Sequence, residues 1–486
     1  MSTQKISNKE KLSYGIGALG KDMAYAIVGS FFMLYCTDVL GLGAGFVGLF
    51  VFAARFWDAI NDLMMGVIVD NTKTRWGKFR PWLLIGTILN SFVIIMLFAD
   101  WGISGKALTI FTVVLYVLWG MTYTVMDIPY WAMLSNFSTN KEEREKMVVI
   151  PRIFASLGGL TVGSFGLKII DYFGNTKGSV GDTHKGYFLF SVLISAIFII
   201  TILITCFNVK SADGISTGSN IPAERTTFKK MLEVITKNDQ LLIAILSILT
   251  FNFATQMMGA ISTYYFIYVA GSEGLFGIFT LFAGISEITG LFLFPKLSKK
   301  ITRKQCYLIA STVPILGFIL LGVTGFIAPQ NAILTAISGI LIKFGSGLQL
   351  GVVTIVLADV VDYGEYKFDS RNEGVTFSLQ TLLVKLTSAF STLIGGFVLE
   401  LTGYVPNAVQ SASTLNGMRF AMCVLPSIFI VISFIIYKTF YKLEGKFFEN
   451  ILNVLALKRE AKEKAFNSSQ LQDDNLQDAN LQNINL

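Results

Sequence analysis

Long apolar runs, each about 20 residues or more, recur along nearly the whole chain and are separated by short polar segments. A run of this length is long enough to cross the hydrocarbon core of a bilayer as an α-helix. The pattern predicts twelve transmembrane helices. We expect them at residues 12–38, 44–70, 81–100, 107–135, 148–171, 186–208, 239–269, 275–296, 306–328, 332–360, 374–402 and 416–440.

A polar stretch rich in Lys, Ser, Thr, Glu and Arg divides these runs into two groups of six. The expected organisation is an N-terminal six-helix bundle at 1–208, a cytoplasmic linker at 209–238 and a C-terminal six-helix bundle at 239–440. The tail at 441–486 is charged and then polar. Its final Leu residues recur every five positions, which gives too few units for a solenoid, and the tail is expected to be disordered.

Basic residues gather in the loops on one side of the predicted membrane protein. Four Lys or Arg lie between 73 and 80, three between 141 and 146, and five between 296 and 304, whereas the turns after the first, seventh and ninth runs contain none. Lys and Arg accumulate in cytoplasmic loops, so we predict a multi-pass protein of the cell membrane with both termini cytoplasmic.

The composition agrees with a polytopic membrane protein, because 53% of residues are hydrophobic and only 15% are charged. The net charge of +7 resides in short loops, and no basic stripe with interleaved aromatic residues indicates nucleic-acid binding. Four scattered Cys residues support neither a disulfide framework nor a zinc site. The single histidine, His184, falls in a predicted outer loop and excludes a Ser-His-Asp triad. An enzyme is therefore not expected.

One glycine pattern imitates a nucleotide-binding motif. Gly15, Gly17 and Gly20 spell GxGxxG, and Lys21 nearly completes a P-loop. Both motifs require a preceding strand, whereas these residues lie in a predicted helix, and Asp22 replaces the hydroxyl residue that would hold magnesium. The glycines are better explained by close helix approach or by access for a sugar.

The second apolar run carries three charged residues, Arg55, Asp58 and Asp62, although it must cross the bilayer. At about 100° per residue, their spacing of i, i+3 and i+7 places them on one face of a helix. A charge at the bilayer centre costs about 2.5–3.5 kcal/mol on insertion scales, and two carboxylates one turn apart also repel each other. We therefore predict a cation site at Asp58 and Asp62.

A second candidate site lies in the segment WGMTYTVMDIPYW, where Asp127 and Trp131 are four residues apart on one helical face. A carboxylate accepts hydrogen bonds from sugar hydroxyls and an indole ring stacks on the C–H face of a sugar, so the pair favours a sugar site. The alternative for Trp131 is an anchor at the membrane interface. Thr124 and Asn61 carry oxygen ligands of the type that hard cations prefer.

Charged residues inside a membrane mark functional sites by default. A buried cavity that holds all eight charged residues of this kind would be formally neutral. These are the acids Asp22, Asp58, Asp62 and Asp127 and the bases Lys21, Arg55, Arg152 and Lys385. The second half of the chain also carries Glu287 and Lys343, an acid and a base that the pattern suggests as a pair.

Acidic residues also mark the end of the tenth run. Asp359, Asp362 and Glu365 are placed opposite the basic loops at Lys141–Arg144 and at Arg303. Salt bridges there would hold the cytoplasmic side shut in one state of a transporter, and the alternative is an ordinary solvated helix end.

Several segments closely resemble the melibiose permeases, which belong to the glycoside–pentoside–hexuronide:cation symporters of the major facilitator superfamily. The likeness extends in order over nearly all of residues 10–440. It is carried by GIGALGKDMA, FWDAINDLMMGVIVDNTKTRWGKFRPWLLIGT, LWGMTYTVMDIPYW, PRIFASLGG, ADVVDYGEYK and SLQTLLVK.

The resemblance implies a fold of twelve helices in two pseudo-symmetric bundles and a set of site residues. Asp58 and Asp62 would bind the coupling sodium, lithium or proton, with Asn61 and Thr124 nearby. The residues that would contact the galactoside are Lys21, Asp22, Asp127, Trp131, Arg152 and Thr381, and Lys385 would lie close to both sites.

Two departures from the family pattern concern the sugar. The pattern has Trp in the tenth span and Tyr in the first, whereas this chain has Leu350 and Gly29. Both changes remove aromatic surface, so the exact sugar is open while the cation site is complete.

The sequence thus predicts a secondary active symporter that imports a sugar, expected to be a galactoside such as melibiose, together with sodium, lithium or a proton. The alternatives are a carrier for another glycoside, pentoside or hexuronide, and an uncoupled sugar exchanger. The expected partners are the sugar, the monovalent cation and the lipid bilayer, with a regulatory protein at the cytoplasmic face as a further candidate. No cofactor is expected.

Overall fold

A computed structural model of the chain describes residues 6–72, 74–136, 141–175, 182–209, 237–368 and 373–458. Within these ranges the regular elements are all helices. Eleven of them are long and apolar enough to cross a membrane. The long helix α1 is not among the eleven, and it carries the charged residues Lys21 and Asp22.

The first half of the chain forms one bundle. Its elements are α1 (Asn8–Leu34), η1 (Tyr35–Val39), α2 (Ala44–Asp70), α3 (Arg80–Leu97), α4 (Gly105–Ala132), η2 (Met133–Asn136), α5 (Lys141–Gly174) and α6 (Thr183–Asn208). The second half forms another bundle. Its elements are α8 (Asp239–Tyr264), η4 (Tyr265–Val269), α9 (Glu273–Ser298), α10 (Arg303–Ile327), α11 (Ala332–Phe368), α12 (Glu373–Leu401), α13 (Ala412–Arg419), η5 (Phe420–Val424) and α14 (Leu425–Phe440).

These elements confirm the all-helical fold predicted from the apolar runs. The main differences lie at two ends, since α5 begins at Lys141 rather than at 148 and α11 continues to Phe368 rather than to 360. The α5 extension contains Lys, Glu and Arg, and the α11 extension contains Asp, Glu, Lys and Tyr. A hydropathy pattern detects only the part of a helix that lies in hydrocarbon. The predicted linker falls almost wholly outside the described residues, so its boundaries stay predictions.

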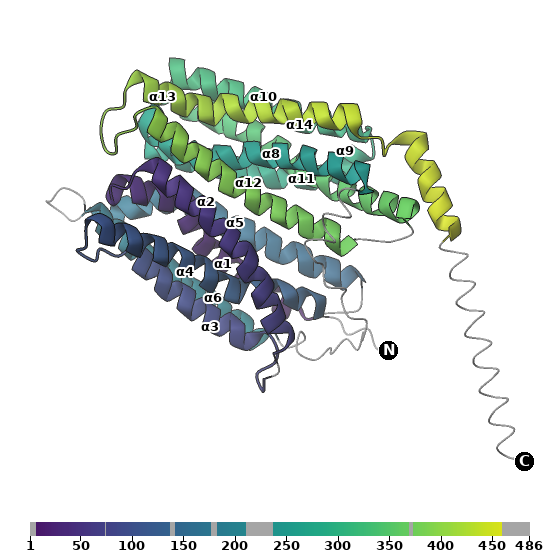
Figure 1. Cartoon of the computed structure of the whole chain (residues 1–486), viewed down its shortest axis with the longest axis horizontal. Coiled ribbons are helices and arrows are strands. Elements are labelled where there is room, and N and C mark those ends of the chain that lie inside the picture. The colour runs from purple at the N-terminus through teal and green to yellow at the C-terminus, as the bar shows by residue number, and fades with distance from the viewer. Residues whose placement is uncertain are drawn as a thin grey trace, which may run out of the picture.

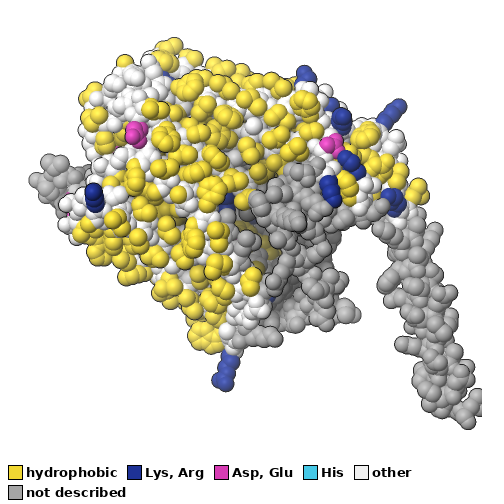
Figure 2. Space-filling view, viewed as in Figure 1, with side chains coloured by type: hydrophobic (Ala, Val, Ile, Leu, Met, Phe, Trp, Pro, Cys, Tyr) yellow, Lys and Arg dark blue, Asp and Glu magenta, His cyan; other side chains and the backbone are white. Residues whose placement is uncertain are grey.

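Both bundles lie side by side with their helices nearly parallel, and the start of α1 lies on the same side as the end of α14 (Figure 1). We call this the terminal side, where α1 begins and α14 ends, and the other the opposite side, where α2 begins and α12 ends. Hydrophobic side chains cover the flank between the two sides, while Lys and Arg side chains are sparse and lie mainly toward its ends (Figure 2). This distribution matches a protein surrounded by lipid.

The tail does not begin as predicted. Residues 445–458 form a helix, and its side chains Phe448, Ile451 and Leu455 are buried against the C-terminal bundle. Their spacing of three and four residues gives this segment an apolar stripe. The composition of the tail did not indicate this stripe, because charged residues surround it. The expectation of disorder is therefore wrong for 445–458, and residues 459–486 lie outside the described part.

The GxGxxG glycines serve helix packing. A Cβ atom on Gly15 would overlap the Phe154 ring of α5, and one on Gly20 would overlap the Thr201 side chain of α6. They lie inside α1, and no strand precedes them in the part of the chain that the structure describes. The nucleotide-binding interpretation is thereby excluded for these residues, and close approach of helices explains them.

The two bundles meet near the opposite side. Helix α2 packs closely on α12 at Gly48, where an added Cβ would lie 2.9 Å from the Thr392 backbone. Helix α5 packs closely on α9 at Gly163, where an added Cβ would lie 2.6 Å from Thr280. The Asp38 carboxylate of η1 also accepts hydrogen bonds from the hydroxyl groups of Tyr268 and Tyr404 in the C-terminal bundle.

Candidate functional site: a charged cavity between the bundles

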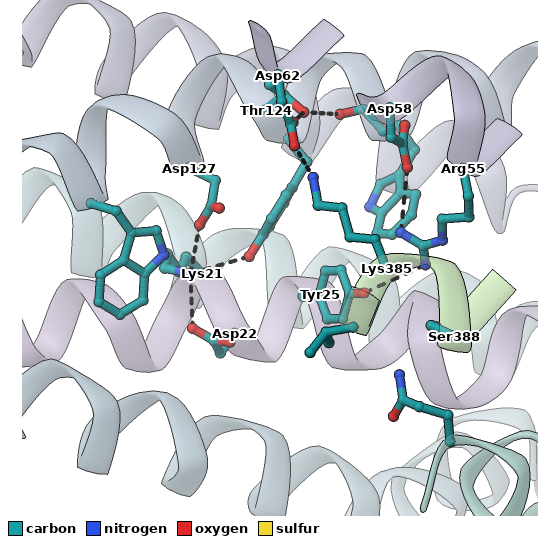
Figure 3. A pocket seen from close by; sticks show the side chains of 16 residues that line it. Lys21, Asp22, Tyr25, Arg55, Asp58, Asp62, Thr124, Asp127, Lys385 and Ser388 are labelled. Carbon is teal, nitrogen blue, oxygen red and sulfur yellow. Dashed lines mark hydrogen bonds and ion pairs between the residues drawn. The ribbon is translucent and has the colours of Figure 1, made fainter. Parts of the chain in front are cut away.

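A cavity of about 280 Å³ lies between the two bundles. The N-terminal bundle contributes to it from α1, α2 and α4, and the C-terminal bundle from α8 and α12. Its wall consists of Lys21, Asp22, Tyr25, Arg55, Asp58, Asp62, Trp119, Gly120, Tyr123, Thr124, Asp127, Trp131, Gln256, Val384, Lys385 and Ser388. Figure 3 shows how these side chains converge.

Lys21 is the centre of the first group of charges. Its ammonium lies 2.7 Å from Asp127 and 3.0 Å from Asp22, and it donates a hydrogen bond of 3.3 Å to the Tyr123 hydroxyl. The Trp131 ring centre is 5.0 Å from the same nitrogen, a distance that allows a cation–π contact. Only 2% of Lys21 is exposed, whereas the Asp22 and Asp127 side chains keep about a quarter of their surface. The two carboxylates are therefore held in place yet remain accessible.

The second group joins Arg55 and Asp58 along α2. An Arg55 Nη atom lies 3.3 Å from the Asp58 carboxylate, and the other donates a hydrogen bond of 3.4 Å to the Tyr25 hydroxyl. This is the i, i+3 contact that the sequence spacing predicted. The Asp58 carboxylate fits against α4 because residue 120 is glycine, since a Cβ at this position would overlap the carboxylate.

Asp62 is the point where the two bundles meet inside the cavity. Its Oδ1 accepts a hydrogen bond of 3.0 Å from the Thr124 hydroxyl on α4. Its Oδ2 forms an ion pair with the Lys385 ammonium of α12, which reaches across from the C-terminal bundle (Figure 3). An ammonium group thus occupies the side of this carboxylate that faces the cavity.

The structure brings most of the predicted site residues to this one cavity. Two of the described predicted members, Arg152 and Asn61, are not part of its wall. Arg152 on α5 is exposed and is not among the wall residues, and Asn61 donates a long hydrogen bond of 3.5 Å to the Met121 carbonyl. The side chain of Thr381 falls outside the described part of the structure.

Without Arg152 the expected neutrality of the cavity is wrong. Among the described residues, four carboxylates and three basic groups form the wall, so one negative charge is in formal excess. Arg152 lies on an exposed face of α5, which no sequence spacing revealed. A wall of this charge is suited to a single monovalent cation.

Sequence reasoning missed several members of the wall. Trp119 and Tyr123 precede Asp127 by eight and four residues, so the helical spacing that linked Asp127 to Trp131 also contained them. Gln256 is an amide in an otherwise apolar span, which is a signal of the same kind as an intramembrane charge. Tyr25 and Ser388 carried no such signal.

The predicted cytoplasmic gate also differs. Asp359 pairs with Arg303, but both residues belong to the C-terminal bundle, and the Tyr441 hydroxyl lies 3.4 Å from the same carboxylate. This pair fastens α10 to α11 and does not join the bundles. The side chains at Lys141–Arg144 lie outside the described part, so a contact with Asp362 or Glu365 stays a prediction.

Three residues outside the cavity complete the comparison with the sequence. The suggested pair is confirmed, because the Lys343 ammonium lies 3.2 Å from both carboxylate oxygens of Glu287. Leu350 is 42% exposed and does not line the cavity.

The chain is similar to known proteins in both sequence and fold. Residues 13–445 match the family model described as MFS/sugar transport protein. A lactose permease of Leuconostoc lactis is 30% identical over 97% of this chain and 76% of its own length. A glucuronide carrier protein homolog of Escherichia coli strain K12 is 28% identical over 92% of this chain and 95% of its own length.

Among solved structures, a bacterial homolog of the human lysosomal transporter Spinster, crystallised inward-facing and unoccupied, has a TM-score of 0.66. It covers 90% of this chain and 98% of its own, at 15% sequence identity, so it supports the fold alone.

Together these matches define a multi-pass membrane transporter with the major facilitator fold. The chain belongs to the MFS/sugar transport protein family, and the resemblance to the glycoside–pentoside–hexuronide:cation symporters is confirmed. It is a sugar symporter of this type.

Proposed function

We propose that the chain imports a galactoside together with one sodium, lithium or hydrogen ion across the cell membrane, with both termini cytoplasmic. The single observation that carries the proposal is the cavity wall, in which four carboxylates face three basic groups beside an indole ring. A related lactose permease supports a galactoside as substrate, whereas the glucuronide carrier homolog supports a hexuronide as the alternative.

The sugar site proposed here lies at the Lys21 group. Asp22 and Asp127 offer carboxylate oxygens to paired hydroxyl groups, and Trp131 offers a flat apolar face at one edge of the same wall. Lys21 lies between the carboxylates, reduces their repulsion and holds their orientation. A galactoside ring combines a polar edge with a C–H face, which is the chemistry that this arrangement favours.

The cation site proposed here lies at Asp58, Asp62 and Thr124. In the absence of a bound ion the Lys385 ammonium balances Asp62, and Arg55 balances Asp58. A monovalent cation at Asp62 would release Lys385 without changing the local charge. This contact joins the two bundles, so its release by the ion changes the relative free energies of the two states of the transporter. The ion then binds the two states with different affinities, and coupling requires such a difference.

The test replaces Asp62 by Cys in proteoliposomes that contain the whole chain. We expect sodium-stimulated galactoside uptake to disappear, while sodium-independent exchange of the sugar persists, because the Lys21 group is intact. Asp171→Cys, at the exposed end of α5, is the matched control and should leave both activities unchanged. Sodium stimulation that survives in Asp62→Cys would contradict the proposal.

One observation favours a second candidate, an uncoupled sugar exchanger. The Lys385–Asp62 pair already balances this carboxylate, so the cavity contains a charge-neutral arrangement at Asp62 that needs no metal ion. Vesicles with a sodium or proton gradient but no internal sugar separate the two candidates. Uphill accumulation supports symport, and exchange without accumulation supports the uncoupled carrier.

A further inference from the structure

The C-terminal bundle carries an ion pair that the cavity does not use. The Lys343 ammonium on α11 lies 3.2 Å from each carboxylate oxygen of Glu287 on α9. Both residues lie well inside helices that span the membrane. Charged side chains at such positions are rare and mark the pathways of polar substrates.

Glu287 continues the stripe of α9 that faces the N-terminal bundle. A Cβ on Gly277 would overlap the Ser164 backbone of α5, and one on Gly284 would contact Leu160. Residues 277, 284 and 287 fall on one helical face, since they are seven and three residues apart. The next turn of α9 toward the terminal side therefore places Glu287 between the stripe that faces α5 and the side that packs on Gly347 of α11, where its carboxylate meets Lys343.

The two helices separate where Glu287 lies. Leu160 packs against Gly284, but Ser156 and Leu157, which continue the same stripe of α5 toward the terminal side, are exposed. The side chains of Glu287 and Lys343 keep 39% and 23% of their surface. The ion pair is thus accessible at the place where the bundles diverge.

The pair lies at the depth of the proposed sugar site. A Cβ on Gly158 of α5 would touch Leu19 and Met23, so this residue packs against the turn of α1 that carries Lys21. Gly158 is two residues from Leu160, and Glu287 is three residues from Gly284, in both cases toward the terminal side. At 1.5 Å per residue the pair and Lys21 differ in depth by about one helical turn or less.

We infer that Glu287 and Lys343 form the C-terminal wall of the sugar site and bind hydroxyl groups of a neutral glycoside. The inference rests on the function proposed above. Within the ion pair the carboxylate still has lone pairs that can accept hydrogen bonds, and the ammonium still has N–H groups that can donate them. A sugar hydroxyl group can donate to the first and accept from the second. An anionic sugar would instead meet the charge of Glu287, so the pair favours galactosides over glucuronides.

A wall on this bundle also meets a requirement of transport. A ligand shifts the equilibrium between two states only if it contacts them differently. The Lys21 group belongs entirely to the N-terminal bundle, so a sugar bound only there would give little preference for either state. Hydroxyl contacts to Glu287 and Lys343 would tie the substrate to both bundles.

The experiment measures exchange of two probes, 4-nitrophenyl α-D-galactoside and 4-nitrophenyl β-D-glucuronide, in proteoliposomes that contain the whole chain. Glu287→Gln should raise the half-saturating galactoside concentration about tenfold, the effect of one lost hydrogen bond to a charged group. It should leave glucuronide binding unchanged or tighter, because the repulsive carboxylate is gone. Lys343→Gln should weaken both sugars, and the glucuronide more.

Two matched controls accompany these variants. Thr289→Val changes a polar residue on another face of α9, and Lys367→Gln removes the 2.8 Å ion pair to Asp239 at the terminal end of α11. Both should leave the ratio of the two sugars unchanged. The inference is overturned if Glu287→Gln and Lys343→Gln alter thermal stability but shift both sugars equally or not at all. A wild-type protein that exchanges neither sugar would instead contradict the proposed function itself.

Discussion

Two carboxylates of the N-terminal bundle, Asp38 near the opposite side and Asp62 in the cavity, are each held by donors from the C-terminal bundle. The donors to Asp38 are the neutral hydroxyl groups of Tyr268 and Tyr404. The donor to Asp62 is the charged ammonium of Lys385. Both contacts join the same two bundles, yet only the second can be replaced by an ion without a change of charge.

The surroundings of the two contacts differ in the same way. The Asn407 amide donates a hydrogen bond of 2.6 Å to the Asp38 backbone carbonyl, and Asn407 has a φ of 55°, a left-handed conformation that Asn tolerates. A loop is thus shaped to close this side. Asp62 instead lies in an open cavity wall, with the Thr124 hydroxyl as its further partner. We infer that the Asp38 contact maintains one state and that the Asp62 contact responds to ligands.

The largest expected effect comes from Asp38→Asn, which removes the charged acceptor of two hydroxyl groups. Hydrogen bonds to a charged group contribute roughly 1.5–3 kcal/mol each, so the closed opposite side should lose about 3 kcal/mol relative to the open one. That loss shifts the population ratio more than a hundredfold. A cysteine introduced at Ser388 in the cavity wall should then react faster with an impermeant thiol reagent from the opposite side.

Asp100→Asn is the matched control for this experiment, since Asp100 accepts a hydrogen bond from Gly102 within a loop and joins no bundles. Tyr404→Phe should give a smaller shift of the same sign as Asp38→Asn. Equal reactivity of the Ser388→Cys protein with and without Asp38→Asn would remove the distinction between the two carboxylates.

The next effect concerns Lys385→Gln, which leaves Asp62 without its charged partner. Removing one member of a buried pair costs about 3–5 kcal/mol, and we discount this to about 2 kcal/mol because both side chains are partly exposed. Sodium-independent galactoside exchange should fall roughly thirtyfold, while sodium should restore much of it by taking the place of the ammonium. Titration of exchange with sodium provides the measurement. Loss of activity that sodium cannot restore would show that the ammonium is needed for the sugar rather than for charge balance.

The smallest effect is expected for Thr124→Val, which removes one neutral donor from Asp62 and leaves the Lys385 pair in place. A hydrogen bond of this kind contributes about 1 kcal/mol, so the sodium concentration for half-maximal stimulation should rise about fivefold. The galactoside concentration for half-saturation should stay the same. Thr122→Val is the control on the same helix, since Thr122 contacts Asn90 and not the cavity. An unchanged sodium requirement would place the cation elsewhere than beside Asp62.

The sequence revealed much of the cavity because helical spacing is a local property. Arg55 and Asp58 contact each other along one helix, and Asp127 and Trp131 share one face, as their spacing required. The same spacing also links Tyr123 and Trp119 to Asp127, but the prediction did not include these two aromatic residues in the site. Asp38 gave no comparable signal, because a single acid near the end of an apolar run is common at a membrane surface.

By itself the sequence determined the helices, since a backbone in hydrocarbon must satisfy its own hydrogen bonds and an apolar run of sufficient length can do so only as a helix. It also determined which charges have to be shielded from lipid. Only the tertiary structure decided the partners that come from the other bundle. Lys385 meets Asp62 across 323 residues, and Arg152 is left outside the wall, because the packing of two bundles sets distances that no local spacing contains.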